Sequence, residues 1–172
     1  MLGWNPDRIF YHPFEVLWIM IVDERFNAVS HIWRRYGLLF KVLIDTYGFE
    51  KTLQHHLEAR SEMDKLSMSS LKEKRDQLDP EQYARAIEGN FIKSGFDAET
   101  RITGDIIEVS VGRCPFYQGL SLAGLSHEII EKVCDSSCSQ RARNFPLYLG
   151  VIDFRKTPED RCIEGFRLKL KK

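Results

Sequence analysis

Residues 96–117, FDAETRITGDIIEVSVGRCPFY, mark the point where the pattern of the chain changes from helical to extended. Apolar or small side chains occupy every second position on both sides of residues 103–105, Thr-Gly-Asp. This alternation is typical of two antiparallel strands joined by a tight turn. Pro115 comes directly after the second strand and favours the first turn of a helix. The stretch therefore predicts a hairpin that leads into a short helix ending near Leu122.

The residues before this hairpin predict helices. Apolar residues recur at intervals of three and four from Phe14 to Tyr36, which is the helical period, and Gly37 is the expected break. The same period predicts a second helix over 39–47 and a third that ends near Met63. The first helix is apolar nearly all round in its first half, which fits either a buried helix or a subunit interface. A homodimer is the second of these interpretations.

A charged stretch from Ser61 to Asp79 follows, and we interpret it as a linker with an exposed helix. Asp79 and Pro80 then predict a helix start, and Gly95 is the expected end of that helix. The pair His55-His56 lies on a polar background, so solvated surface is the expected environment of both rings.

The last third of the chain returns to the sheet. Ser126 opens a helix that should reach Arg143, residues 147–154 have strand character, and the final strand alternates from Cys162 to Leu170. The predicted fold is a single α+β domain over residues 1–172. Its helical part (1–95) is followed by a four-stranded antiparallel sheet with two inserted helices (ββααββ, 96–172).

Composition excludes some classes of function. The chain has 172 residues with 25 basic and 25 acidic side chains, and this zero net charge argues against nucleic acid as a partner. The apolar run Val16–Val22 is too short to cross a membrane, and the start lacks the order of a signal peptide. We therefore expect a cytoplasmic protein without membrane insertion, with reduced thiols, that acts on or binds a small molecule.

All four cysteines lie in the last third: Cys114, Cys134, Cys138 and Cys162. A metal site, a disulfide pair, a reactive thiol and simple packing are the alternatives, and the expected reduced state makes the disulfide the weaker one. Cys114 stands where a strand passes into a helix, so the helix dipole favours its thiolate. Arg113 beside it adds to that effect.

Cys134 and Cys138 are four residues apart and share one helix face, on which His127 and Glu131 also fall. Thiolates at this spacing could chelate zinc with His127, but the usual C-x2-C spacing is absent. Buried packing explains the same cysteines, because Cys often acts as a small apolar residue. Cys162 should point inward from its strand. No nucleotide-binding or hydrolase motif occurs, and no metal or cofactor is expected.

The layout resembles the L-2-amino-thiazoline-4-carboxylic acid hydrolase (ATC hydrolase-like) family. Residues 111–117, VGRCPFY, are similar to its strand that ends in Cys-Pro. Residues 120–134 with Gly124 look like its helix with a second cysteine, and 160–163, DRCI, are similar to its last turn and strand. One departure is Cys138, where many members carry an aspartate.

The resemblance implies hydrolysis at the amidine-like carbon of a thiazoline, which gives a carbamoyl-cysteine. In that scheme Cys114 attacks the carbon, while His127 or Glu131 activates water or protonates the leaving atom. Cys134 belongs to the same catalytic group. Arg113 would hold the substrate carboxylate, with Cys138 and Cys162 lining the substrate site.

A second hypothesis comes from a different class. The late half is also similar to vinyl-reductase-type domains, which bind small ligands and sometimes zinc. Under this hypothesis the protein binds a ligand without catalysis, and the cysteines hold a metal or line an apolar pocket.

Overall fold

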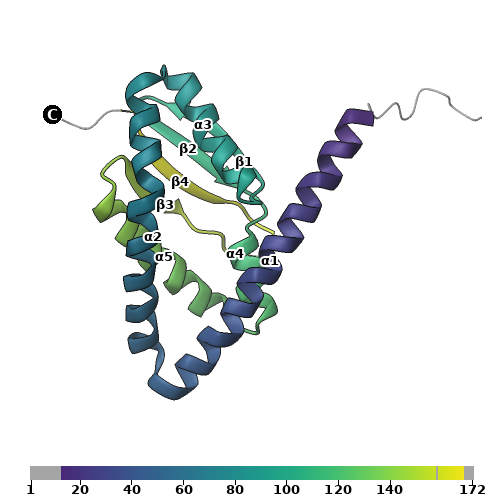
Figure 1. Cartoon of the computed structure of the whole chain (residues 1–172), viewed down its shortest axis with the longest axis vertical. Helices are drawn as coiled ribbons and strands as arrows, with labels where there is room; N and C mark the ends of the chain where they lie inside the picture. Colours follow the sequence, from purple (N-terminus) through teal and green to yellow (C-terminus); the bar gives the residue numbers. More distant parts are fainter. Residues whose placement is uncertain (1–12, 158, 169–172) are drawn as a thin grey trace, which may run out of the picture.

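The computed structural model describes residues 13–157 and 159–168, and for residues 13–22 and 65–77 it describes the backbone alone. Three helices come first, then a hairpin, two further helices and two final strands (Figure 1). Their bounds are α1 Pro13–Tyr47, α2 Phe49–Gln77, α3 Pro80–Lys93, β1 Ala98–Thr103, β2 Ile106–Val111, α4 Pro115–Leu122, α5 His127–Asn144, β3 Tyr148–Asp153 and β4 Cys162–Arg167. The predicted α+β class and the ββααββ order are confirmed.

The sheet has the order β1-β2-β4-β3, and all neighbouring strands are antiparallel. The tight turn at Gly104 has a φ of 64°, a conformation that glycine adopts without steric cost. In the central pair, Val111 is opposite Cys162 and Ile107 is opposite Phe166. These four residues are buried on one face of the sheet, as the alternation of the last strand predicts.

Helices cover that face of the sheet. α3 packs on β1 and α5 packs on β3, while α2 runs across both helices (Figure 1). Asp79 caps α3, since its side chain accepts from the Gln82 backbone while the Gln82 side chain accepts from the Asp79 backbone. The core between α3 and the strands includes Tyr83, Ile87 and Val109. Among the described residues, no helix forms a layer on the opposite face of the sheet.

A second core joins α1, α2, α4 and α5, and it depends on close helix contact. Gly37 lies inside α1 and does not end it. A Cβ atom at this position would stand 2.7 Å from the Ala123 Cβ and 3.0 Å from Leu120 Cδ2. Glycine thus lets α1 approach α4, and the prediction of a helix break at Gly37 is wrong because packing, not local propensity, decides this position.

Two further boundaries differ from the expectation. α2 continues from Phe49 to Gln77, so the predicted end near Met63 and the linker after Ser61 are wrong. This stretch contains no glycine or proline, and its charged residues have good helix propensity. His55 is exposed as expected, but His56 is 8% exposed, so its assignment to solvated surface is wrong.

No helix within the described residues is long and apolar enough to span a bilayer. The side chains of residues 13–22, which include the apolar run at the start of α1, lie outside the described set. In its second half, Ile32, Leu39 and Val42 are more than half exposed. The homodimer stays a prediction.

Candidate functional site

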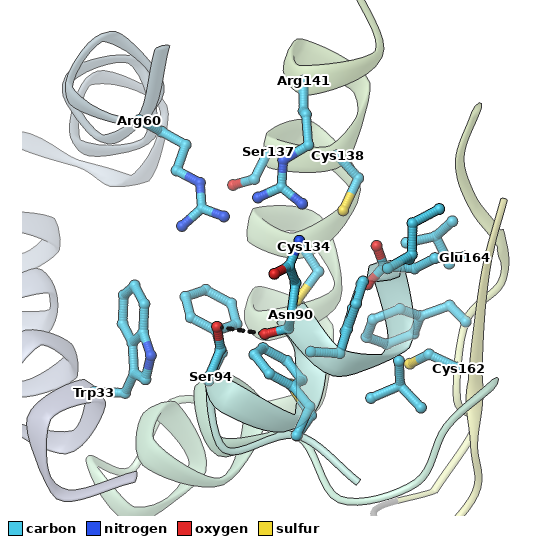
Figure 2. Close-up of a pocket in the computed structure, with 18 of the residues that line it drawn as sticks. Trp33, Arg60, Asn90, Ser94, Cys134, Ser137, Cys138, Arg141, Cys162 and Glu164 are labelled. Carbon is cyan, nitrogen blue, oxygen red and sulfur yellow. Dashed lines mark hydrogen bonds between the residues drawn. The ribbon is translucent and has the colours of Figure 1, made fainter. Parts of the chain in front are cut away.

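A cavity of about 490 Å³ lies between the two cores. All five helices and the sheet contribute to its wall, so residues from almost the whole length of the described chain meet there (Figure 2). Apolar walls come mainly from aromatic rings, and a smaller polar part comes from α2, α5 and β4. The residues that line it are Trp33, His56, Arg60, Ile87, Asn90, Phe91, Lys93, Ser94, Phe96, Val111, Cys114, Phe116, Cys134, Ser137, Cys138, Arg141, Val151, Phe154, Cys162, Glu164 and Phe166.

All four cysteines line this cavity, although 48 residues separate the first from the last in sequence. Cys134 and Cys138 face it from α5, Cys162 from the start of β4, and Cys114 from the N-cap of α4. None of the four forms a disulfide. The inward orientation of Cys162 and the shared face of Cys134 and Cys138 are confirmed.

Cys114 has the predicted position at a helix start, where its Sγ accepts from the Tyr117 backbone N–H at 3.3 Å. Burial nevertheless raises the pKa of the Cys114 thiol to about 12, and this outweighs the opposing effects of that hydrogen bond and of Arg155. The expected thiolate is therefore not favoured, because the low-polarity surroundings cost more than the helix N-terminus contributes.

The thiols on α5 follow the same trend. Burial raises the pKa of Cys138 to about 12, with a further contribution from the negative charge of Glu164. Burial also raises the pKa of Cys134 well above its ordinary value. At neutral pH these thiols are protonated, so they present weakly polar, polarisable groups to the cavity.

The remaining predicted site residues do not meet the cysteines. His127 lies at the start of α5, where Nδ1 is 2.8 Å from the Tyr117 hydroxyl and the ring contacts Phe154. Glu131 is exposed. Arg113 is exposed as well and forms an ion pair with Asp23. The structure thus separates His127, Glu131 and Arg113 from the cavity lining.

The cysteines are also not arranged as metal ligands. Within the described part of the chain, no group of three His, Cys, Asp or Glu side chains is placed to hold a metal ion. A zinc site formed by Cys134, Cys138 and His127 receives no support from this geometry, since His127 begins the helix seven residues earlier, roughly 10 Å along its axis.

Two arginines that sequence reasoning missed supply the charge of the cavity. Arg60 on α2 and Arg141 on α5 point toward the same part of it (Figure 2). Both direct Nε toward one oxygen of Asp64, at 3.6 Å from Arg60 and 3.3 Å from Arg141. Asp64 is 3% exposed and lies behind the two guanidinium groups. In sequence, Arg60 sits in a charged stretch that looks like ordinary helix surface, so only the packing of α2 on α5 identifies it.

Glu164 faces the cavity from β4, opposite α5. The Tyr148 hydroxyl donates to its Oε2 at 2.7 Å. Burial raises the pKa of Glu164 above its ordinary value, against the opposing influence of Arg141, of this hydrogen bond and of Arg60. The alternation of the last strand predicts the inward face for this residue, and the structure shows it half-buried there.

His56 on α2 and Ser137 on α5 line the cavity and connect the two helices that carry the arginines. The ring has Nδ1 2.5 Å from the Tyr36 hydroxyl and Nε2 2.9 Å from Ser137 Oγ. Ser137 in turn donates to the Val133 carbonyl at 2.6 Å. This direction leaves Ser137 as an acceptor for the Nε2–H of His56, with Tyr36 donating to Nδ1. Ser137 is therefore not arranged as a nucleophile activated by a histidine base.

A buried arginine outside the cavity lining lies near Cys114 and Cys162. Arg155 is 3% exposed, and its Nε donates to Cys162 Sγ at 3.2 Å while Nη2 donates to the Gly112 carbonyl at 2.9 Å. Its guanidinium also lies 4.9 Å from the centre of the Tyr117 ring. These contacts fasten the loop after β3 to the end of β2 and hold Cys162 in place.

Comparison with known proteins gives no assignment. No protein-family model matches the chain, and neither a curated protein nor a solved structure matches it.

Proposed function

We propose that this protein binds a small organic molecule in the cavity, without converting it chemically. The observation that carries the proposal is the cavity of about 490 Å³, a size within the range of roughly 300–1,000 Å³ that ligand pockets have. Its wall combines aromatic rings with a few convergent polar groups, which is the usual composition of such pockets.

The hydrolase hypothesis uses the same cavity but needs an activated group as well. Cys114, Cys134 and Cys138 carry raised pKa values, and His127 and Glu131 stand apart from them. Hydrolysis of a thiazoline stays a prediction. Binding requires no activated group, and the described residues already provide the cavity that it needs. The zinc-binding form of the binding hypothesis lacks a preformed set of three donors among the same residues.

Binding of 1-anilinonaphthalene-8-sulfonate (ANS), measured by fluorescence and calorimetry, tests the proposal. Asn90→Phe adds a ring to the cavity wall, whereas Ile92→Phe adds the same ring to the same helix outside the lining. We expect the wild type and Ile92→Phe to bind alike and Asn90→Phe to bind at least about tenfold more weakly, a difference of roughly 1.4 kcal/mol. Equal binding by all three proteins, or no saturable binding, would contradict the proposal.

A further inference from the structure

The charged side chains of the cavity wall are mostly basic. Arg60, Lys93 and Arg141 line it, and Glu164 is the one acidic side chain among the lining residues. Lys93 is exposed at the C-terminal end of α3, while the two arginines lie deeper. The whole chain has no net charge, so this local excess is a property of the cavity and not of the composition.

The two arginines are only partly neutralised. Their side chains are 23% and 14% exposed, and they share one oxygen of a single aspartate, Asp64, through their Nε atoms. Among the residues that the structure describes, no hydrogen bond or ion pair engages the terminal Nη groups of Arg60 or Arg141. These Nη groups are the edges that Figure 2 shows directed into the cavity. The two guanidinium groups thus present four terminal Nη groups, with up to eight N–H donors of fixed geometry, to an acceptor in the cavity.

The two guanidinium groups repel each other, and this repulsion bears on the pKa of Arg60. Burial lowers the pKa of Arg60, and repulsion by Arg141 lowers it further, against the attraction of Asp64 and Glu164. Burial also acts to lower the pKa of Arg141, but Tyr148, Glu164 and Asp64 around it outweigh burial and raise it. An anion placed between the two guanidinium groups would relieve this repulsion. Arginine forms paired, charge-assisted hydrogen bonds with planar carboxylates, which suits the two facing groups.

The rest of the wall fits an apolar body. Trp33 and Phe116 meet edge to face with ring centres 4.6 Å apart, and Phe91, Phe96 and Phe154 also line the cavity. Such rings favour apolar or planar groups through burial and offset stacking. The cavity is therefore divided into a cationic end between α2 and α5 and an aromatic remainder.

We propose that the ligand is an organic carboxylate whose anionic group is held between Arg60 and Arg141 and whose apolar body occupies the aromatic part of the cavity. This inference rests on the proposed function and adds the chemical class of the ligand. Glu164, which accepts from Tyr148, faces the cavity from the opposite wall. Trp33 and Phe116 contribute to affinity, whereas the arginine pair contributes selectivity for the anion.

Isosteric pairs test the selectivity: cinnamate with cinnamamide, and octanoate with octanamide. Their affinities are measured by displacement of ANS and by calorimetry at neutral pH on the full chain. We expect each carboxylate to bind about ten- to a hundredfold more tightly than its amide, the range of hydrogen bonds to charged groups. Arg60→Gln and Arg141→Gln should each remove most of this preference while leaving amide binding little changed.

Matched variants separate this effect from a loss of folding. Arg143→Gln removes the same charge from the exposed side of α5, where Nη2 contacts Gln140 at 3.3 Å, and should keep the full preference. Arg60→Lys retains the positive charge and should keep part of it. Retained amide binding reports that the cavity of each variant is intact.

The outcomes distinguish the two proposals. A preference that follows Arg60 and Arg141 supports the inference. Equal affinity for acid and amide, or carboxylates that do not bind while Asn90→Phe still abolishes ANS binding, would overturn the inference and leave the proposed function standing. Absence of saturable binding by ANS and by both pairs would overturn both.

Discussion

His56 Nε2 lies 2.9 Å from Ser137 Oγ, and this contact joins α2 to α5 across 81 residues of sequence. Tyr36 on α1 completes the connection at the other ring nitrogen. Both His56 and Ser137 are buried, and both line the cavity beside the arginines. The network therefore fixes the distance between the helices that carry Arg60 and Arg141.

Ser137→Ala should destabilise the protein by about 1–3 kcal/mol, because it leaves the buried Nε2–H of His56 without an acceptor. Urea denaturation monitored by circular dichroism measures the change. Ser139→Ala on the exposed side of the same helix is the control, with an expected effect within about 0.5 kcal/mol. Equal effects of the two substitutions would show that the His56 contact contributes nothing to stability.

The neutral state of His56 predicts a pH dependence. Burial, with the nearby charge of Arg60, lowers the pKa of His56 from 6.5 to about 4. As the pH falls below 6.5, His56 becomes protonated in the unfolded chain, whereas in the folded chain it stays neutral down to about pH 4. The contribution of neutral His56 to the free energy of unfolding is fully present above pH 6.5. It is lost as the pH falls toward 4, and the loss amounts to roughly 3 kcal/mol.

The pKa of Glu164 is raised, so its contribution to stability grows as the pH falls, opposite to that of His56. A comparison of the wild type with a His56 variant removes this second effect. The stability difference between the wild type and His56→Gln should shrink as the pH falls from 7 to 4.5. His55→Gln, which changes the exposed neighbour, should leave the pH profile of the wild type nearly intact. A constant difference between wild type and His56→Gln across this range would contradict a buried, neutral His56.

Close contact between α1 and α4 predicts opposite effects for the same substitution at two helical glycines. A Cβ on Gly119 would stand 2.6 Å from the Ser30 carbonyl oxygen and 2.8 Å from the Arg34 nitrogen, whereas a Cβ on Gly89 would meet nothing within 4 Å. Gly119→Ala should cost about 1–3 kcal/mol through overpacking. Gly89→Ala should stabilise α3 by roughly 0.5–1 kcal/mol. Thermal unfolding of both variants gives the signs, and a stabilising Gly119→Ala would refute the contact.

The raised pKa values of the cavity thiols predict slow alkylation at neutral pH. Iodoacetamide at pH 7 should alkylate Cys114, Cys134 and Cys138 more slowly in the native protein than in urea, since protonated thiols are poor nucleophiles. Mass spectrometry of the digested protein gives the rate at each cysteine. One rapidly alkylated thiol that disappears in Cys114→Ser would instead favour the hydrolase hypothesis.

Local patterns were sufficient to predict the sheet, α3 and the placement of the cysteines. Strand alternation sets the face of Cys162, helix periodicity sets the common face of Cys134 and Cys138, and Pro115 sets the start of α4. The same helix periodicity did not predict correctly that His127 and Glu131 would join the cysteines in one site. Residues on one stripe of a helix can still lie a turn or two apart along its axis.

The charged end of the cavity could not be predicted from local patterns. Arg60 and Arg141 are far apart in sequence and meet only through the packing of α2 on α5. The same holds for His56, whose burial depends on Tyr36 and Ser137 from two other helices. Gly37 shows the converse case, in which a residue that favours a helix end is retained inside a helix for contact with a neighbour.

The most direct test of a ligand cavity is a methyl NMR titration of the protein with ANS. We expect shifts centred on Ile87, Val111 and Val151, which line the cavity, with little change at the exposed Ile32 and Ile152. Saturable shifts confined to the first group would support binding inside the cavity. Shifts centred on Ile32 and other exposed positions of α1, with the cavity methyls unchanged, would contradict it.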